Sequence, residues 1–109
     1  MNQLTSSGEL DSAVSGGTAI LYKHSTTCPI SAAAREQMES FLQRNPDAPF
    51  FMVDVNDSAD VSSYVVEKTG IQHESPQVIV FRDGKPAYHA NHYDITADDL
   101  EQQLGSARS

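Results

Sequence analysis

The chain contains a single cysteine, Cys28, in the stretch HSTTCPIS at residues 24–31. Pro29 suits the first position of a helix, because its missing N–H would have no helical partner there. Cys28 then caps the helix, and its sulfur can accept hydrogen bonds from the N–H groups of Ile30 and Ser31. The partial positive charge at the start of a helix also favours the thiolate over the thiol. Because the thiolate is the nucleophile in thiol–disulfide exchange, this pattern predicts a reactive cysteine.

Ser31 stands three residues after the cysteine, where Cys-x-x-Cys oxidoreductases keep a resolving cysteine. A serine cannot form a disulfide, but its hydroxyl can donate a hydrogen bond to the thiolate. A group that Cys28 takes from a mixed disulfide must therefore be released to an external thiol, which is monothiol chemistry. The alternative is that Cys28 is a small buried residue at a loop–helix junction. A Thr-Cys-Pro sequence that opens a helix directly after a buried strand favours the reactive role.

Four further residues are candidates for contact with a substrate. Thr26 and Thr27 flank the sulfur in a loop. Pro76 stands just before a buried strand, where proline marks an edge or a special backbone site. We expect a cis bond between Ser75 and Pro76, which would turn the chain and present the backbone of Ser75 toward a neighbouring site.

Histidines supply weaker candidates. His24 ends the first strand and could stabilise the thiolate if its ring points inward, although such a histidine more often satisfies local backbone groups. Lys23 precedes it and should point to the opposite face of a regular strand. His89, His92 and Asp94 match no standard zinc spacing and have no cysteine beside them, so we expect a polar strand end and no metal site.

Composition limits the classes of function. A chain of 109 residues is expected to form one domain, 1–109, and one cysteine excludes an internal disulfide framework. The net charge of −8 should repel phosphate backbones and anionic lipids, so nucleic-acid and membrane partners are not expected. The amino terminus has neither a basic start nor an apolar signal region, and the expected location is therefore the cytoplasm.

The elements that must position these residues follow from apolar periodicity and from capping and breaking residues. The expected elements are a helix at 3–15, a strand at 18–23, a helix from Pro29 to a break at 44–49, a strand at 50–55, a helix at 56–70 with Asp57 or Ser58 as its cap, a hairpin of strands at 77–82 and 86–93, and a helix from a Thr96 cap to Gly105. A strand–helix–strand unit requires a parallel pair, and the hairpin adds antiparallel strands. The order predicts an α/β fold with a four-stranded mixed sheet, helices on both faces and an N-terminal helix.

This arrangement resembles the thioredoxin fold, in which a strand leads to a Cys-x-x-Cys or Cys-x-x-Ser segment, a helix follows, and a proline precedes the third strand. More narrowly, the sequence is similar to the monothiol bacilliredoxins, small proteins of the bacillithiol redox system whose hallmark is Thr-Cys-Pro-Ile-Ser. All five hallmark residues occur here, as Thr27, Cys28, Pro29, Ile30 and Ser31.

The resemblance covers residues 18–104 and implies a cytosolic protein that removes bacillithiol from S-thiolated proteins, with Cys28 as the attacking thiolate. It implies bacillithiol as a co-substrate, no cofactor, and a substrate pocket shaped by Ser75 and Pro76. The monothiol glutaredoxins that carry iron–sulfur clusters have the motif Cys-Gly-Phe-Ser. This chain has Pro29 and Ile30 in the two middle positions, which argues against cluster binding. The alternatives are a glutaredoxin-like enzyme that uses another low-molecular-weight thiol, a non-catalytic thioredoxin-like adaptor or redox sensor, and an iron–sulfur carrier.

Overall fold

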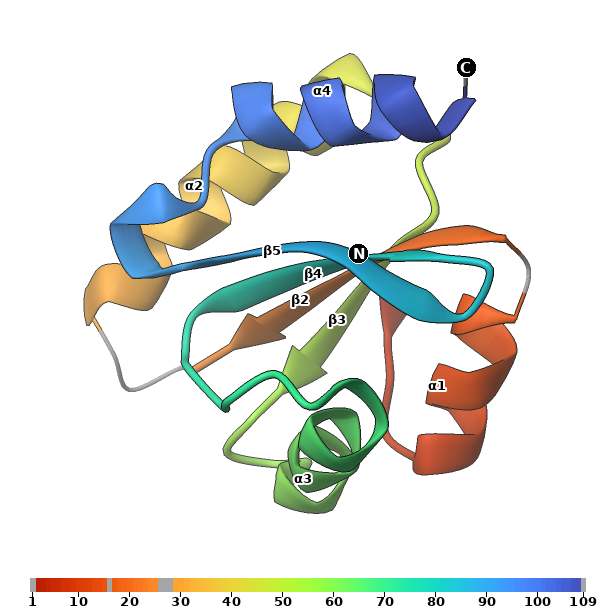
Figure 1. Ribbon diagram of the computed structural model, residues 1–109. Helices are drawn as coiled ribbons and strands as arrows, with labels where there is room; N and C mark the ends of the chain where they lie inside the picture. The colour runs from red at the N-terminus through yellow and green to blue at the C-terminus, as the bar shows by residue number, and fades with distance from the viewer. Residues whose placement is uncertain (1, 16, 26–28, 109) are drawn as a thin grey trace.

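The four predicted strands form one mixed sheet, and a short strand near the amino terminus extends it (Figure 1). The computed structural model describes residues 2–15, 17–25 and 29–108. Within these residues the strand order is β1-β3-β2-β4-β5; β3 is parallel to β1 and β2, and β4 is antiparallel to β2 and β5. The strands are β1 (Asn2–Gln3), β2 (Thr18–His24), β3 (Phe50–Asp54), β4 (Gln77–Arg82) and β5 (Lys85–Asn91).

Helices cover both faces of this sheet, as the order of elements predicts. In Figure 1, α2 (Pro29–Arg44) and α4 (Ala97–Arg108) lie together on one face, and α1 (Ser7–Val14) and α3 (Ala59–Thr69) lie on the other. A short 3-10 helix, η1 (His92–Asp94), joins β5 to α4. No helix formed by the described residues is both long enough and apolar enough to cross a membrane.

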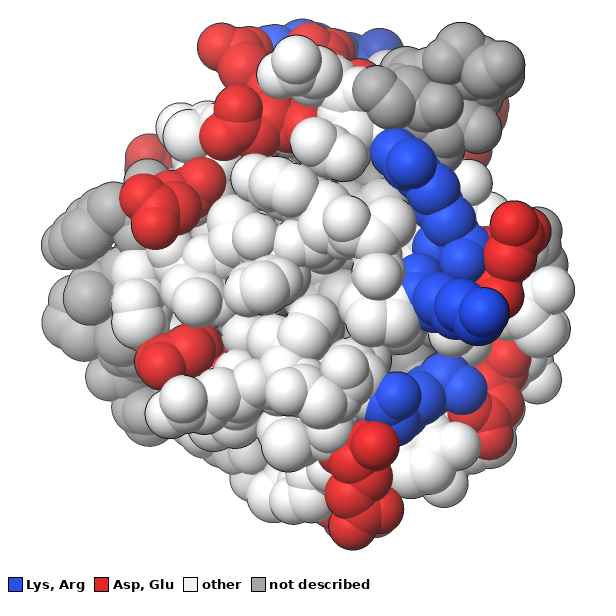
Figure 2. All heavy atoms as spheres, in the orientation of Figure 1, with Lys and Arg blue, Asp and Glu red and all other residues white. Residues whose placement is uncertain are grey.

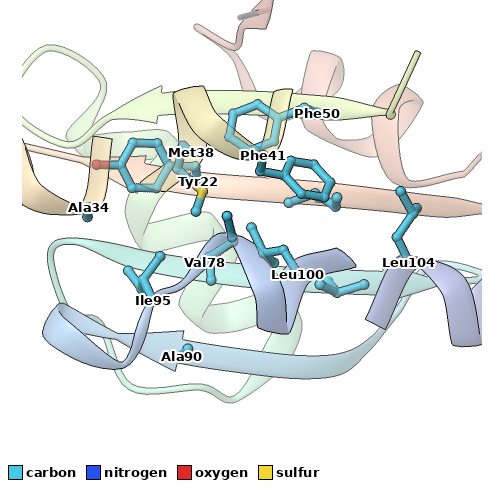
Figure 3. Close-up of a cluster of buried hydrophobic side chains, with 13 residues drawn as sticks. Tyr22, Ala34, Met38, Phe41, Phe50, Val78, Ala90, Ile95, Leu100 and Leu104 are labelled. Atoms are coloured by element: carbon cyan, nitrogen blue, oxygen red, sulfur yellow. The ribbon is translucent and has the colours of Figure 1, made fainter. Parts of the chain in front are cut away.

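Each face of the sheet has its own hydrophobic core. On the α2 and α4 side, Met38 and Phe41 of α2 pack with Tyr22, Phe50 and Leu100 (Figure 3). The other side is built from residues such as Leu21, Leu10 and Val65. Successive residues of β2 alternate between the two cores, so this central strand is buried from both directions. The ends of β2 are therefore held rigidly between two packed layers.

The first helix is shorter than the predicted segment 3–15. It begins at Ser7, because the side chain of Ser6 accepts a hydrogen bond from the backbone N–H of Glu9 at 3.2 Å. The Glu9 carboxylate in turn accepts a bond from the Thr5 backbone N–H at 3.2 Å, which completes a reciprocal cap. The residues before this cap pair with β3, and the prediction missed their strand because two residues carry no periodic signal.

The helix α3 also begins differently from the prediction. Ser58 occupies the cap position, but its side chain makes no capping hydrogen bond. The Asp54 carboxylate at the end of β3 accepts bonds from the backbone N–H groups of Asn56 at 2.9 Å and Asp57 at 3.3 Å instead. The turn into the helix is thus fixed by a strand residue that the local sequence pattern did not single out.

The hairpin forms with the predicted two-residue turn. Asp83 and Gly84 have φ angles of 54° and 81°, and two positive values are typical of the turn that matches the twist of paired strands. The second strand ends at Asn91 rather than at residue 93. His92, with φ of 53°, takes the chain out of the extended conformation and into η1.

The last helix has the predicted cap but not the predicted end. The side chain of Thr96 accepts a bond from the backbone N–H of Asp99 at 3.2 Å. The helix then continues through Gly105 to Arg108. A glycine inside a helix lowers stability without ending the helix, whereas Gly70, with φ of 72°, does end α3.

Charge is distributed unevenly on the face that carries β5. Figure 2 shows Lys and Arg side chains gathered along one side of this face and acidic side chains mostly at other margins. The middle of the face carries neither, in line with β5, where the only Lys, Arg, Asp or Glu residue is Lys85. The charged groups thus lie mainly around the margins of this face.

Candidate active site

The hallmark residues 27–31 span the junction between β2 and α2 in the sequence. The strand β2 ends at His24, and α2 begins at Pro29, which is the first helical residue that the sequence predicts. Ile30 and Ser31 lie in the first turn of α2, but their side chains and that of Pro29 lie outside the described part of the structure. Thr26, Thr27 and Cys28 also lie outside the described residues, so the roles predicted for them stay predictions.

The second predicted segment lies at the same end of the sheet. The Ser75–Pro76 peptide bond is cis, as the sequence predicts. Gln77, the next residue, opens β4 and is paired with Lys23 near the end of β2. Two segments that are about fifty residues apart in the sequence therefore meet where the chain leaves β2 for the cysteine.

Side-chain and backbone contacts hold the loop before Pro76 from both sides. His73 Nδ1 lies 3.1 Å from the Ser62 hydroxyl of α3. Glu74 Oε2 lies 3.3 Å from His92 Nε2 of η1. The backbone N–H of His92 donates a hydrogen bond of 3.0 Å to the carbonyl oxygen of Pro76. These contacts fix the backbone of the loop against two elements that belong to different faces of the sheet.

His24 is buried on the α2 side of the sheet. Its ring therefore points inward, which is the orientation that a role in stabilising the thiolate would require. Its Nδ1 atom lies 3.0 Å from the Tyr22 hydroxyl. Burial lowers the pKa of His24, the nearby Arg35 lowers it further, and Asp54 opposes these effects. At neutral pH the imidazole is therefore uncharged, and it can offer a hydrogen bond but no positive charge to a thiolate.

Comparison with known proteins identifies the family. The family model of the monothiol bacilliredoxin BrxC matches residues 2–100. The chain belongs to the monothiol bacilliredoxin family. This finding agrees with the resemblance stated for residues 18–104, whose hallmark motif is residues 27–31.

Solved structures place this bacilliredoxin-family chain in the thioredoxin fold. A structure described as a candidate oxidoreductase with a thioredoxin fold is 32% identical, with a TM-score of 0.87, and the match covers 99% of this chain and 93% of that one. Mitochondrial thioredoxin 3 of Saccharomyces cerevisiae is 17% identical, with a TM-score of 0.77 and coverage of 97% and 94%. Fasciola hepatica thioredoxin is 16% identical, with a TM-score of 0.76 and coverage of 98% and 99%. Family and fold together give the chain a thiol redox function of the thiol–disulfide oxidoreductase kind.

Lys23 is a residue of this bacilliredoxin-family chain for which the sequence predicted a direction but no role. Its side chain points to the face opposite His24, as expected, but it is fully buried, and its Nζ atom has no hydrogen-bond partner among the residues that the structure describes. Burial lowers the pKa of Lys23 to about 8, and the negative charge of Glu74 opposes that shift. The sequence feature that could have pointed to Lys23 is a lysine at an inward position of a strand that is otherwise mostly apolar.

His73 shares the environment of this lysine. Burial lowers the pKa of His73, the charge of Lys23 lowers it further, and Glu74 raises it. His73 also lines a groove of about 590 Å³ that runs beside α3 from residue 55 to the loop before Pro76. The groove opens at the carboxyl end of β3, where ligands commonly bind in α/β proteins.

The described residues contain no group of three or more His, Cys, Asp or Glu side chains that could hold a metal ion. His89 is exposed on β5, and His92 is engaged with Glu74. Within the described residues, His89 and His92 therefore lie near the end of β5 and do not form part of a metal-ligand cluster.

Proposed function

We propose that this protein removes bacillithiol from mixed disulfides on cytosolic proteins, with Cys28 as the attacking thiolate. The observation that carries this proposal is the position of the only cysteine, which directly precedes the first residue of α2 in a chain of the monothiol bacilliredoxin family. A helix start stabilises a thiolate through its free N–H groups and its dipole. The absence of a second cysteine in the sequence favours a monothiol route.

The reaction proceeds by two exchanges. The Cys28 thiolate attacks the bacillithiol sulfur of the mixed disulfide; a bond forms between these two sulfurs, and the substrate protein leaves with the electron pair as its own thiolate. A second bacillithiol thiolate, or a thiolate of another redoxin, then attacks the bacillithiol sulfur on Cys28. This step releases the Cys28 thiolate and leaves the incoming thiol joined to bacillithiol in a new disulfide. Exchange of this kind is fastest when the attacking thiol has a pKa near the ambient pH.

The surrounding residues have distinct roles in this proposal. Pro29 starts the helix, and the N–H groups of Ile30 and Ser31 stabilise the thiolate together with the Ser31 hydroxyl. Thr26 and Thr27 contact the substrate beside the sulfur, and His24 offers a hydrogen bond as a neutral ring. Ser75 and Pro76 shape the pocket for the substrate disulfide, which is supported by their place next to the end of β2.

The proposed partners follow from this chemistry. Bacillithiol is a co-substrate and no resident cofactor takes part. The macromolecular partners are S-thiolated cytosolic proteins, rather than nucleic acids or membranes, and the acidic sequence with a net charge of −8 supports this choice. The protein accordingly acts in the cytoplasm.

The reactivity of Cys28 is tested by measuring its alkylation rate against pH, with the modified protein detected by mass spectrometry. Because the sequence has one cysteine, the profile belongs to one thiol. We expect an apparent pKa well below the value of about 8.5 for a free cysteine. A thiol that ionises only at about 8.5 or above would exclude the catalytic role and leave an adaptor.

The substrate is tested by incubating the reduced protein with a protein–bacillithiol mixed disulfide and, in parallel, with the matching glutathione mixed disulfide. We expect rapid release of bacillithiol, slower release of glutathione, and no release by Cys28→Ser. Faster release of glutathione would instead indicate a glutaredoxin-like enzyme that uses another thiol. Iron bound during expression and retained on purification would indicate the iron–sulfur carrier.

A further inference from the structure

The position of Lys23 is exceptional for a lysine. It follows Ala19 and Leu21 on the face of β2 that packs against α1 and α3, where the other side chains form a hydrophobic core. Lysine usually keeps its charged end in water while its stem lies along apolar surface. Here even the Nζ atom is inaccessible to solvent and has neither a hydrogen bond nor an ion pair among the described residues.

Burial of an unpaired ammonium group opposes folding, because the charge loses its hydration without gaining a partner. An apolar side chain at this position would pack against the core without that penalty. Residues that break a local rule of folding in this way are expected at functional sites. Lys23 therefore calls for a functional explanation.

The charge lies at the end of the sheet that carries the candidate active site. Lys23 is paired across the strands with Gln77, the residue that directly follows Pro76. The Gln77 side chain donates hydrogen bonds to the carbonyl oxygen of Gln72 at 3.0 Å and to Asn91 at 2.9 Å. Within the described part of the chain the side-chain oxygen of Gln77 has no hydrogen-bond partner, so Gln77 does not accept a hydrogen bond from Lys23.

Two ionisable groups act on Lys23, and both belong to the loop before Pro76. Glu74 is its electrostatic partner, but the Glu74 carboxylate lies 3.3 Å from His92 on the other side of the loop. His73 interacts with Lys23 unfavourably when both are charged. Neither residue forms an ion pair with Lys23, so its positive charge has no direct partner within the described part of the chain.

The chain itself limits the distance from this charge to the thiol. Cys28 follows Lys23 by five residues, so their Cα atoms are no more than about 18 Å apart. At such distances a charge in the protein interior acts on an anion more strongly than it would through water. A thiolate is the only anionic form that Cys28 can take in the reaction.

We propose that Lys23 is a positioning residue of the thiol–disulfide reaction, whose buried ammonium group stabilises the Cys28 thiolate by its electric field. This role rests on the proposed function of Cys28. It differs from the role of the helix start, because the charge belongs to a side chain of β2 and not to the backbone of α2. Lys23 does not touch the substrate, since its charged end is closed off from the surface.

The test compares Lys23→Met with Lys85→Met, which removes the same charge from an exposed residue beside the hairpin turn, at the other end of the sheet. The alkylation rate of the single thiol is measured against pH in both variants and in the unmodified protein. We expect Lys23→Met to raise the apparent thiol pKa by about 0.5 or more, and to slow alkylation about threefold at a pH below both pKa values. Lys85→Met should change the pKa by less than about 0.2, because solvent and salt screen an exposed charge.

Equal pKa values in Lys23→Met and Lys85→Met would overturn the proposal, because only a nearby buried charge distinguishes the two. Circular dichroism shows whether Lys23→Met is folded, and Lys23→Gln provides the same comparison if it is not. The alkylation profile does not require exchange activity. If Lys23→Met leaves the thiol pKa unchanged while the unmodified protein still releases bacillithiol from the mixed disulfide, only this inference is rejected. If the unmodified protein has no exchange activity, the proposed function is rejected.

Discussion

Two neighbouring ionisable side chains at the end of β2, Lys23 and His24, are buried on opposite faces of the sheet. Burial disfavours the charged form of each, so it lowers both pKa values. The consequences differ because the reference values differ. His24 becomes neutral at physiological pH, whereas Lys23, with a pKa of about 8, still carries most of its charge at neutral pH. Of these two side chains, Lys23 is therefore the one that carries a positive charge at neutral pH.

Lys23→Met is expected to stabilise the folded protein at neutral pH. In the folded state the pKa of Lys23 is about 8 instead of 10.5, so the unfolded state binds more protons between these values. The stability penalty is fully present below about pH 8 and is relieved as pH rises toward 10.5. Urea unfolding at about pH 6.5 should show a gain of up to about 3 kcal/mol for the variant, narrowing to about half at about pH 9.5. A gain that does not depend on pH would show that packing, rather than charge, causes it.

Ser31→Ala should raise the apparent pKa of the Cys28 thiol modestly, because it removes a hydroxyl that can donate to the thiolate and leaves the helix start unchanged. The alkylation profile that tests Cys28 also measures this effect. Ser63→Ala, at an exposed position of α3, is the matched control and should leave the thiol pKa unchanged. An unchanged profile in Ser31→Ala would exclude the hydroxyl contact and leave the backbone groups and the charge of Lys23.

At the scale of secondary structure, the ends of elements place the functional residues. Pro29 begins α2 directly after the cysteine, and the end of β2 meets the start of β4 through the pairing of Lys23 and Gln77. At Ser6 and Thr96 a side chain next to the helix fixes where the helix starts. At α3 the turn is fixed by Asp54, from the preceding strand. The active-site end of the sheet is thus organised by contacts between elements.

Ser6→Ala is expected to destabilise the protein by about 1 kcal/mol, because Ser6 caps α1 by accepting a hydrogen bond from Glu9. The midpoint of urea unfolding measures this loss. Ser12→Ala, at an exposed position inside the same helix, is the control and should be neutral or slightly stabilising, because alanine is the better helix former. Equal effects in the two variants would show that the cap contributes nothing.

At the scale of the whole molecule, two cores hold a sheet whose central strand is buried from both sides. The surface adds ion pairs such as that of Arg44 with Asp98 and Glu101, at 2.8 Å and 3.0 Å, which link α2 to α4. Exposed ion pairs contribute little, because water and salt screen them. The position of α2, and with it the position of its amino terminus, is therefore determined mainly by apolar packing.

Met38→Ala should lower the free energy of unfolding by about 2–5 kcal/mol, because Met38 is fully buried between α2 and the sheet. Arg44→Ala, in the same helix, should have a much smaller effect, since its ion pairs are exposed. Chemical unfolding of both variants gives the comparison. An Arg44 effect as large as that of Met38 would mean that surface charges, rather than the core, hold α2 against α4.

The sequence by itself predicted monothiol chemistry and determined the order of the main elements. One cysteine before a helix-starting proline, with serine in the resolving position, defines a monothiol pattern because these properties are local to a few neighbouring residues. The strands, the main helices and the Asp83-Gly84 turn were predictable for the same reason, since periodicity and turn preference act over short distances. The cis bond between Ser75 and Pro76 was also predicted from a local signal, a proline at the entrance of a buried strand.

Only the tertiary structure decided which distant groups meet and what environment they share. It paired Lys23 with Gln77, buried the Lys23 ammonium group with no partner among the described residues, and placed Glu74 beside His92. It also supplied the strand β1, which exists only because β3 lies beside it. Burial and strand pairing depend on residues that are distant in the sequence, so a local sequence pattern cannot predict them. The sequence could therefore point to Cys28 as the candidate nucleophile, while the buried charge proposed to tune it became visible only in the folded protein.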